Sequence, residues 1–476
     1  MKIKLIKPAV PLGSESTQPN SVRLQDVALP LLAALTPEKH TVTIVDESFA
    51  PDNTDEDVDL VGLTVWTDLA RRSYRIADQY RKRGVMVAMG GIHPTMVPEE
   101  VAEHCDAVVV GEGERAWPQL VRDAEAGKLQ KFYRAAILPT LDGLPIPRRD
   151  LYPRLAYWNL VPLSVGIEAS RGCIYDCEFC SVLKVRGHTY RVRPAKEIIR
   201  EIETIASNYL VFVDDNTALN RKAARELFRA MIPLKRQWVA EANASLAHDP
   251  ELLTLMKLSG CVGLKVGFES VQKDTIQQTK KLKHLKVDYA EALHRFHDAG
   301  IAVFGNFVFG FDYDTPDVFD QTLEFAVREK LDFGQFRELV PYPGTPLYDR
   351  LRAEGRLIDP QWWLNPDRKF GDATPAFSPR RMSPQQLIDG LAYVSKEFYS
   401  VPSIVKRFFG IKPGHRSLLG VSLHLTINWF FGRRYRSLYD TPTDGGTRLP
   451  GEGRASLLHD RTGAVPSVGK GSGLES

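Results

Sequence analysis

The chain has 476 residues, of which 43% are hydrophobic and 25% charged, a composition typical of globular proteins with room for two or three domains. Its 62 Lys and Arg residues nearly balance 59 Asp and Glu residues, so the net charge of +3 predicts no global attraction to nucleic acid. The sequence has no apolar run of about 18 residues, and MKIKLIKPAV at its start is typical of a strand rather than a signal peptide. We therefore expect a cytoplasmic protein.

The first 135 residues alternate predicted strands with predicted helices. Strands are expected at 2–8, 41–46, 58–66, 85–89 and 107–110, and helices at 27–35 and 70–83. Because these strands are too apolar to be half-exposed, they predict a parallel sheet covered by helices. Glycines directly after two strands would let a ligand approach the backbone at the carboxyl edge of the sheet. The pattern predicts a Rossmann-like domain that binds a small molecule, although it lacks the G-x-G-x-x-G dinucleotide fingerprint.

The rest of the chain divides into four predicted parts. Residues 136–158 are rich in proline and are expected to form an extended linker. From 159 to 350 the α/β rhythm resumes, with strands expected at 163–168, 209–214, 238–242, 262–269, 303–309 and 333–339. Residues 351–439 are mainly helical by pattern and suggest a lid over the site. The Gly-, Ser- and Pro-rich tail, 440–476, is expected to be disordered.

Three of the five cysteines, Cys173, Cys177 and Cys180, lie within eight residues after the first strand of the second α/β part. Three thiolates on one loop can hold three corners of a cubic iron–sulfur cluster and leave the fourth iron open. A disulfide interpretation fails because three thiols cannot pair among themselves. A zinc site with Cys261 or His188 as the fourth ligand stays open, although structural zinc usually uses two short Cys/His pairs.

The segment Arg171–Cys180 resembles the cluster loop of the radical S-adenosylmethionine (SAM) superfamily, including the aromatic Phe179 before the last cysteine. The resemblance implies a partial (β/α)6, TIM-like barrel that binds a 4Fe-4S cluster through the three cysteines. SAM would chelate the open iron and be cleaved to a 5′-deoxyadenosyl radical. By the same resemblance, SAM would be contacted by polar residues at the predicted strand ends, Asp214, Asp215, Asn216 and Glu269, and by Phe179 of the cysteine loop. Arg191 is a candidate for binding the SAM carboxylate. A helix N-cap is the alternative for the Asp-Asp-Asn run, and a surface loop for the arginine.

The segments GGIHPT (90–95) and VVVGEGE (108–114) resemble the cobalamin-binding domain that is often fused ahead of a radical SAM domain. Carried over to this sequence, the residues that would line the corrinoid are Thr64, Gly90, Gly91, Gly111 and Glu112. The D-x-H-x-x-G string that supplies a cobalt ligand does not occur, and His93 is expected to have a role in its loop instead. A domain that packs on its neighbour and binds nothing is the alternative.

Together the two resemblances imply a cobalamin-dependent radical SAM methyltransferase that acts on an unactivated carbon of a natural-product, lipid or tetrapyrrole substrate. A reductant such as flavodoxin or ferredoxin is then expected as a partner. An oxidoreductase or cyclase without methyl transfer, a radical enzyme that modifies tRNA or protein, and a non-catalytic iron–sulfur or corrinoid sensor are the alternatives. Residues 398–439 have no acidic residue and mix basic with apolar side chains, which predicts either a helical cap on the barrel or peripheral contact with an anionic membrane.

Overall fold

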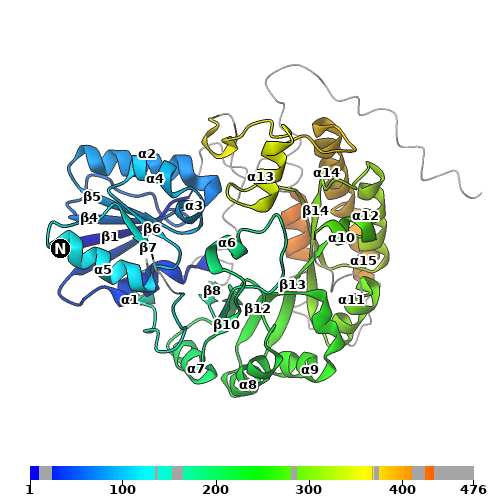
Figure 1. Ribbon diagram of the computed structural model, residues 1–476. Helices are drawn as coiled ribbons and strands as arrows, with labels where there is room; N and C mark the ends of the chain where they lie inside the picture. The colour runs from blue at the N-terminus through cyan, green and yellow to red at the C-terminus, as the bar shows by residue number, and fades with distance from the viewer. Residues whose placement is uncertain are drawn as a thin grey trace, which may run out of the picture. The chain divides into compact units, whose positions relative to one another are not determined.

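The structure is a computed structural model that describes residues 1–9, 24–134, 138–152, 164–279, 287–366, 368, 375–409 and 424–433 (Figure 1). The predicted tail, and parts of the predicted linker and of the basic segment 398–439, lie outside the described residues. Within the described residues the predicted α/β fold class is confirmed, since two parallel sheets are covered by helices.

The first sheet holds six parallel strands in the order β3-β1-β4-β5-β6-β7. Its strands are β1 (Lys2–Lys7), β3 (Thr41–Asp46), β4 (Leu60–Thr64), β5 (Met86–Gly90), β6 (Ala107–Val110) and β7 (Phe132–Arg134). Its helices are α1 (Ala28–Leu35), α2 (Ala70–Lys82), α3 (Ile92–Met96), α4 (Pro98–His104) and α5 (Gly113–Glu125). The short β7 is the one strand of this sheet that the sequence pattern did not predict.

Alternate residues of these strands build two separate cores. Val61 and Leu63 of β4 pack with α2 on one face, while Leu60 packs with α1 and α5 on the other. This follows from the period of two in a strand, which points successive side chains to opposite faces. Helices therefore cover both faces of the sheet (Figure 1), and sheets of this kind bind ligands at their carboxyl edge.

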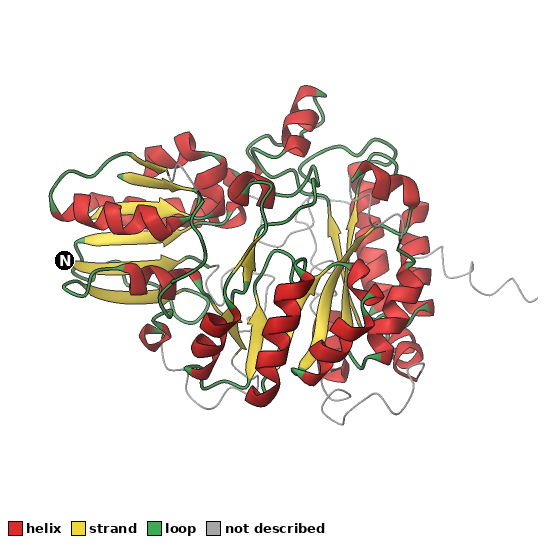
Figure 2. Cartoon of the chain, turned by 60° about the horizontal axis from the view of Figure 1, so that its bottom comes forward, coloured by secondary structure: helices red, strands yellow, loops and turns green. Residues whose placement is uncertain are grey.

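The second sheet is a partial barrel of seven parallel strands in the order β15-β14-β13-β12-β11-β8-β2. Its strands are β8 (Ser164–Ile167), β11 (Tyr209–Phe212), β12 (Gln237–Ala242), β13 (Cys261–Glu269), β14 (Ala302–Phe309), β15 (Phe333–Glu338) and β2 (Leu24–Gln25). Helices α7 (Ala195–Glu203), α8 (Arg221–Met231), α9 (Pro250–Leu258), α10 (Lys273–Gln278), α11 (Tyr289–Asp298) and α12 (Asp317–Arg328) cover it on the outside (Figure 2).

The six barrel strands were predicted from the sequence and are confirmed, but β2 was not predicted. It pairs with β8 through Leu24 and Gln25, which lie opposite Ser164 and Val165. The chain then continues directly into α1 of the first sheet. The two α/β parts are thus joined by a strand pairing.

The C-terminal helices differ from the predicted lid. Helix α14 (Pro384–Phe398) buries Leu387 and Leu391 in the barrel core beside α12 and β15. The Tyr399 hydroxyl donates to the carbonyl of Gly334 in the edge strand β15 at 2.7 Å and accepts from its amide at 3.2 Å. An edge strand with free backbone groups invites unwanted pairing. Helix α14 and Tyr399 therefore cover the edge of the barrel, and a lid role for the rest of 351–439 stays a prediction.

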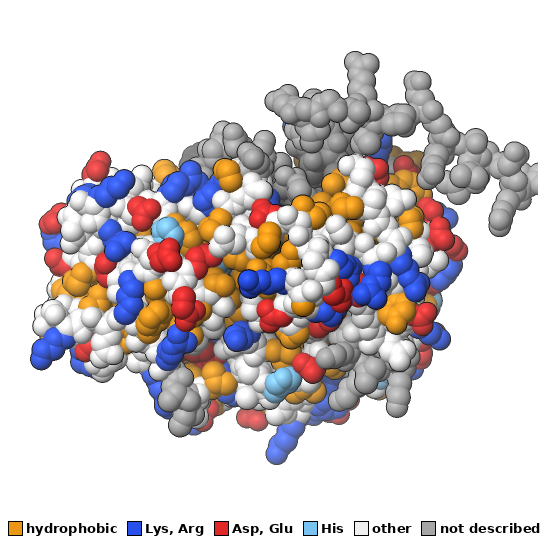
Figure 3. All heavy atoms as spheres, turned by 45° about the horizontal axis from the view of Figure 1, so that its top comes forward, with side chains coloured by type: hydrophobic (Ala, Val, Ile, Leu, Met, Phe, Trp, Pro, Cys, Tyr) orange, Lys and Arg blue, Asp and Glu red, His pale blue; other side chains and the backbone are white. Residues whose placement is uncertain are grey.

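The basic segment contributes a buried arginine to this packing. Arg407 of α15 (Val401–Phe409) is fully buried and donates to the carbonyls of Leu331 and Phe398 and to Asn428 Oδ1, at 2.8 to 2.9 Å. This matches the helical-cap interpretation for the described part of 398–439. No described helix combines the length and apolar character needed to cross a bilayer. Acidic and basic side chains are interspersed on the face in Figure 3. Peripheral membrane contact stays a prediction.

Candidate functional site

The cysteine loop leaves the carboxyl end of β8 and is closed at its base by two short antiparallel strands. β9 (Ser170–Arg171) pairs with β10 (Arg191–Val192), so that Arg171 lies opposite Arg191. Gly172 follows with a φ of +92°, and a Cβ atom there would lie 2.0 Å from the carbonyl oxygen of Thr189. Only glycine fits at this position, because it needs no room for a side chain and tolerates positive φ.

The three cysteines between these strands form no disulfide, and Cys177 is buried while Cys173 and Cys180 are half-buried. The amide of Cys180 donates to the Cys177 carbonyl at 3.0 Å. Among the residues that the structure describes, no three Cys, His, Asp or Glu side chains converge on one metal-ion position. A cubic cluster does not require such convergence, because each thiolate binds a different iron. Three thiols on one loop therefore fit a 4Fe-4S cluster.

The zinc alternative loses one of its two candidate ligands. Cys261 begins β13, so it lies at the amino edge of the barrel, whereas the cysteine loop leaves the carboxyl edge. Its side chain is 1% exposed, and burial raises the pKa of its thiol. His188 lies on the loop itself, with an exposed side chain 3.9 Å from Asp176. Cys261 therefore cannot complete a zinc site with the loop cysteines.

Polar residues that follow β11 contact the cysteine loop. Asp215 Oδ2 accepts from the amide of Gly172 at 2.8 Å, and Asn216 Nδ2 lies 3.9 Å from the sulfur of Cys173. Asn243 at the end of β12 (its Nδ2) donates to Asn216 Oδ1 at 3.2 Å. The N-cap of α8 is Asn220, so the N-cap alternative for residues 214–216 is wrong. Asp215 and Asn216 stand beside the cysteine loop, and their contact with SAM stays a prediction.

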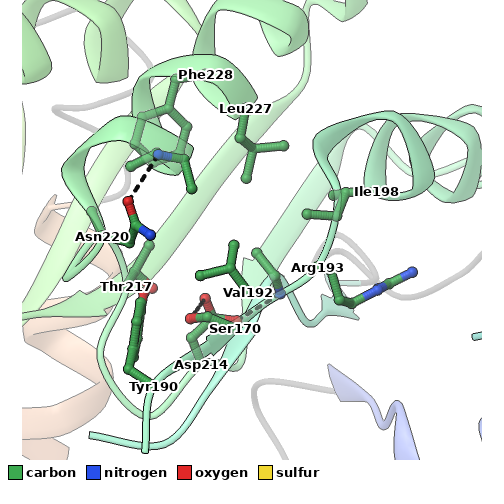
Figure 4. Close-up of a pocket in the computed structure, with 14 residues that line it drawn as sticks. Ser170, Tyr190, Val192, Arg193, Ile198, Asp214, Thr217, Asn220, Leu227 and Phe228 are labelled. Atoms are coloured by element: carbon green, nitrogen blue, oxygen red, sulfur yellow. Dashed lines mark hydrogen bonds between the residues drawn. The ribbon is translucent and has the colours of Figure 1, made fainter. Parts of the chain in front are cut away.

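Asp214 points the other way. It accepts from the amide of Ala169 at 2.8 Å and from the Ser170 hydroxyl at 2.7 Å, and burial raises its pKa to about 7. Figure 4 shows it beside Ser170, next to Tyr190, at a cavity of about 20 Å³. That space is enough for one water molecule and not for a substrate. The contacts favour a role for Asp214 in bracing the loop over direct SAM binding.

Two further predicted SAM residues occupy distinctive positions. Glu269 ends β13 at 8% exposure with a φ of +63°, and the pairing of β13 with β14 shifts register beside it. A non-glycine residue in this conformation is uncommon and often marks a functional site. Phe179 packs edge-to-face on Phe311, with ring centroids 5.8 Å apart, and so anchors the cysteine loop. The contacts of Glu269 and Phe179 with SAM stay predictions.

The residues predicted to line a corrinoid come together at the carboxyl edge of the first sheet, which we call the corrinoid edge. Thr64 and Gly90 are register partners at the ends of β4 and β5, and Gly111 follows the neighbouring β6. Gly91 has a φ of +110°, and a Cβ there would lie 3.0 Å from the Val65 carbonyl. Thr95 Oγ1 donates to the Gly91 carbonyl at 2.7 Å and accepts from the Gly111 amide at 2.9 Å. Sequence reasoning missed Thr95, although it ends the quoted GGIHPT segment.

His93 does not face this edge as a free ligand. Its ring is fully buried, with Nε2 2.9 Å from the Tyr74 hydroxyl and 3.3 Å from Glu100. Trp363, from the short 3-10 helix Trp362–Leu364, donates to Glu100 at 3.0 Å. Burial alone would raise the pKa of Glu100, but the hydrogen bonds from His93, Tyr74 and Trp363 hold it below its usual value. His93 therefore helps to dock the C-terminal segment on the first sheet.

Glu112 connects the carboxyl edge of the first sheet with the cysteine loop of the barrel. Its Oε2 accepts from Arg171 and Arg191 at 3.0 Å each, and its Oε1 accepts from Arg186 at 2.8 Å and from the second nitrogen of Arg191. Burial alone would raise the pKa of this fully buried carboxyl, but the three arginines hold it at about 2. Glu112 and Arg191, predicted for two different ligands, thus contact each other. Contact of Glu112 with a corrinoid stays a prediction.

The fold and the cysteine loop define a class of enzyme that binds an iron–sulfur cluster at the mouth of a partial barrel. Residues 167–326 match the family model of the radical SAM superfamily, and residues 23–121 match that of the B12 binding domain. The chain belongs to the radical SAM superfamily, in the branch that carries a cobalamin-binding domain. It is accordingly an enzyme whose domains imply a 4Fe-4S cluster, SAM and cobalamin as cofactors.

The chain is similar to several enzymes of this branch. It is 29% identical to bacteriochlorophyllide d C-12(1)-methyltransferase of Chlorobaculum tepidum over 81% of this chain and 85% of the relative. It is 26% identical to the anaerobic magnesium-protoporphyrin IX monomethyl ester cyclase of Cereibacter sphaeroides over 72% of this chain and 60% of that one. Its fold resembles the radical SAM methyltransferase TsrM from Kitasatospora setae, with a TM-score of 0.64, 15% identity, and coverage of 92% and 98%.

Proposed function

We propose that the protein is a cobalamin-dependent methyltransferase that adds a methyl group to an unactivated carbon of a tetrapyrrole, lipid or other natural product. When bound, the cluster and SAM supply a radical that removes a hydrogen atom, and cobalamin supplies the methyl group. The observation that carries the proposal is the buried contact of Glu112 with Arg171, because it brings the corrinoid edge and the cysteine loop to one place. The similarity to a bacteriochlorophyllide methyltransferase over most of both chains supports the tetrapyrrole class.

Several residues of this chain would serve the reaction without taking part in bond changes. Asp215 and Asn216 contact the cysteine loop at Gly172 and Cys173, and they would thereby support the thiolates that hold the cluster. Gly91 and Gly111 allow a large planar ligand to approach the backbone of the first sheet. The walls of the two domains would exclude water from a reactive intermediate.

The test is anaerobic reconstitution of the full chain with iron, sulfide and a corrinoid, followed by turnover with SAM that carries a deuterated methyl group. Candidate substrates are a chlorophyllide, a protoporphyrin ester and a polycyclic triterpene, with reduced flavodoxin as the electron donor. We expect a product whose mass includes the labelled methyl group, together with 5′-deoxyadenosine. Production of 5′-deoxyadenosine with no labelled product from any substrate would leave methyl transfer unsupported.

A cyclase or oxidoreductase is the second candidate, and its support is the similarity to the anaerobic cyclase. In that case the product of the protoporphyrin ester would lose hydrogen or gain oxygen, while the labelled methyl group stays on the methionine that is released from SAM. The same mass spectra distinguish the two functions, since only methyl transfer carries deuterium into the product.

A further inference from the structure

We propose that Glu112 is a positioning residue that fixes the cysteine loop against the corrinoid edge and thereby sets the separation of the two cofactors. The inference rests on the proposed function in requiring the cluster and the corrinoid to be bound together. It goes beyond that function because it assigns the control of their distance to one carboxylate. Glu112 stands one residue after Gly111, in the loop that follows β6.

The geometry favours such a role because the partners of Glu112 define the whole cysteine loop. Arg171 and Arg191 lie opposite each other in the β9–β10 pair, at the two points where the loop begins and ends. Arg186 ends α6 (Val182–Arg186), which lies inside the same loop. One carboxylate therefore contacts the beginning, the interior and the end of the segment that carries Cys173, Cys177 and Cys180.

The electrostatics make this contact difficult to replace. Three arginines share a buried cluster with three carboxylates, because Glu114 lies 2.5 Å from Arg171 and Glu168 lies 2.7 Å from it. The Arg171 side chain is 5% exposed, and that of Glu112 is fully buried. Removing the carboxylate that all three arginines share leaves positive charge in this cluster less well compensated, which costs free energy. Relaxation of the cysteine loop away from the corrinoid edge would relieve that cost.

Glu114, two residues further along in the first turn of α5, provides a matched control. It is acidic, 10% exposed and ion-paired with Arg171, but it does not share Arg186 and Arg191 in the way that Glu112 does. A general loss of charge in the cluster should affect Glu112→Gln and Glu114→Gln alike. Control of loop position by the shared carboxylate should affect Glu112→Gln far more.

The experiment measures the magnetic interaction between the reduced cluster and cob(II)alamin by EPR in the reconstituted full chain, with SAM present and no substrate. Such an interaction falls steeply with distance, so it reports cofactor separation directly. We expect Glu112→Gln to keep the iron and corrinoid content of the wild type. Its magnetic interaction between cluster and cob(II)alamin should be weaker or lost, while Glu114→Gln should retain the interaction. Glu112→Asp should give an intermediate signal, because a shorter carboxylate restores charge but not reach.

Three outcomes overturn the inference. Equal spectra for Glu112→Gln and the wild type would show that the carboxylate does not set the distance. Joint loss of iron and corrinoid in Glu112→Gln would show a role in folding alone. Absence of any interaction in the wild type with both cofactors bound would show that they are not held close. Because no substrate is used, a wild type with normal coupling but without methyl transfer would refute only the proposed function.

Discussion

Arg350 Nη2 lies 2.8 Å from Glu178 Oε1, so helix α13 (Pro346–Ala353) is tied to the cysteine loop between its second and third cysteines. The same arginine also reaches Asp312 at 2.8 Å, and the amide of Leu347 donates to the carbonyl of Glu178 at 2.9 Å. The cysteine loop is thus held at its base by the first sheet and near its tip by the chain that follows the last barrel strand. Both supports are thus supplied by segments far from the cysteine loop in the sequence.

Replacing Arg350 by Met should therefore loosen the tip of the cysteine loop. We expect a loss of about 1–3 kcal/mol of unfolding free energy, because the partly buried charged hydrogen bonds to Glu178 and Asp312 are removed. We also expect faster loss of iron on exposure to a chelator. Chelator kinetics and thermal unfolding of the reconstituted protein measure both effects. Arg352→Met is the control, since Arg352 is exposed on the same helix. Equal iron release from the two variants would contradict the proposed support.

Replacing Cys177 by Ala should abolish cluster assembly and SAM cleavage together, because two remaining thiolates cannot hold the cubane in this loop. Iron content and 5′-deoxyadenosine formation are the measurements. Cys261→Ala is the matched control, since that thiol is equally buried but lies at the opposite edge of the barrel. A Cys177→Ala protein that still releases 5′-deoxyadenosine would show that the ligand set is wrong.

Replacing Gly91 by Val should weaken corrinoid binding and leave the iron signal intact. The new side chain would press on the backbone of Val65 at 3.0 Å and would have to adopt a φ of +110°, which distorts the edge that Thr64 and Gly111 share. Ultraviolet–visible titration with a corrinoid measures the affinity. In Gly127→Val, the control, φ is +65° but nothing lies within 4 Å of the new Cβ. If both variants lose iron and corrinoid equally, general misfolding explains the result.

The raised pKa of Asp214 predicts that the stability of the folded protein depends on pH. Its folded pKa of about 7 lies above the ordinary 3.8, so the folded state holds a proton that the unfolded state releases. This contribution is complete below about pH 4 and is lost as the pH rises toward about 7. Asp214→Asn should remove the dependence, so that the stability of the wild type relative to this variant falls by up to about 1.4 kcal/mol per pH unit in between.

Thermal unfolding of the reconstituted protein between about pH 5 and 8 checks this expectation. Asp312→Asn is a suitable control. Burial alone would raise the pKa of Asp312, but Arg356 and Arg350 hold it below 3.8, so Asp312 is ionised in both states across this range. A difference between the wild type and Asp214→Asn that does not change with pH would contradict the raised pKa.

The helices and strands could be predicted from the sequence because the patterns that indicate them are local. Buried parallel strands appear as short apolar runs, and the cysteine spacing limits the chemistry of its loop. The side to which Asp214 points was also available, since it follows Leu210 and Phe212 in the alternation of a strand. That signal is ambiguous, because an Asp-Asp-Asn run at a strand end is typical of a ligand site whichever way its side chains face.

The contacts between distant segments could not be predicted in the same way. Nothing near Glu112 indicates that Arg171, Arg186 and Arg191 meet it, because each acidic or basic residue has many possible partners in a nearly neutral chain. The pairing of Leu24 with Ser164 is equally hidden, since a two-residue strand carries no periodicity. Such contacts depend on the relative placement of whole sheets, which a single sequence does not encode locally.

The short pairing of β2 with β8 limits how the two halves of this enzyme can be exchanged. A hybrid that joins a foreign corrinoid module at the proline-rich connection would leave the first barrel strand with an open edge. A successful chimera should therefore keep Leu24 and Gln25 as a segment of the barrel, placed between the first strand and the first helix of the new module.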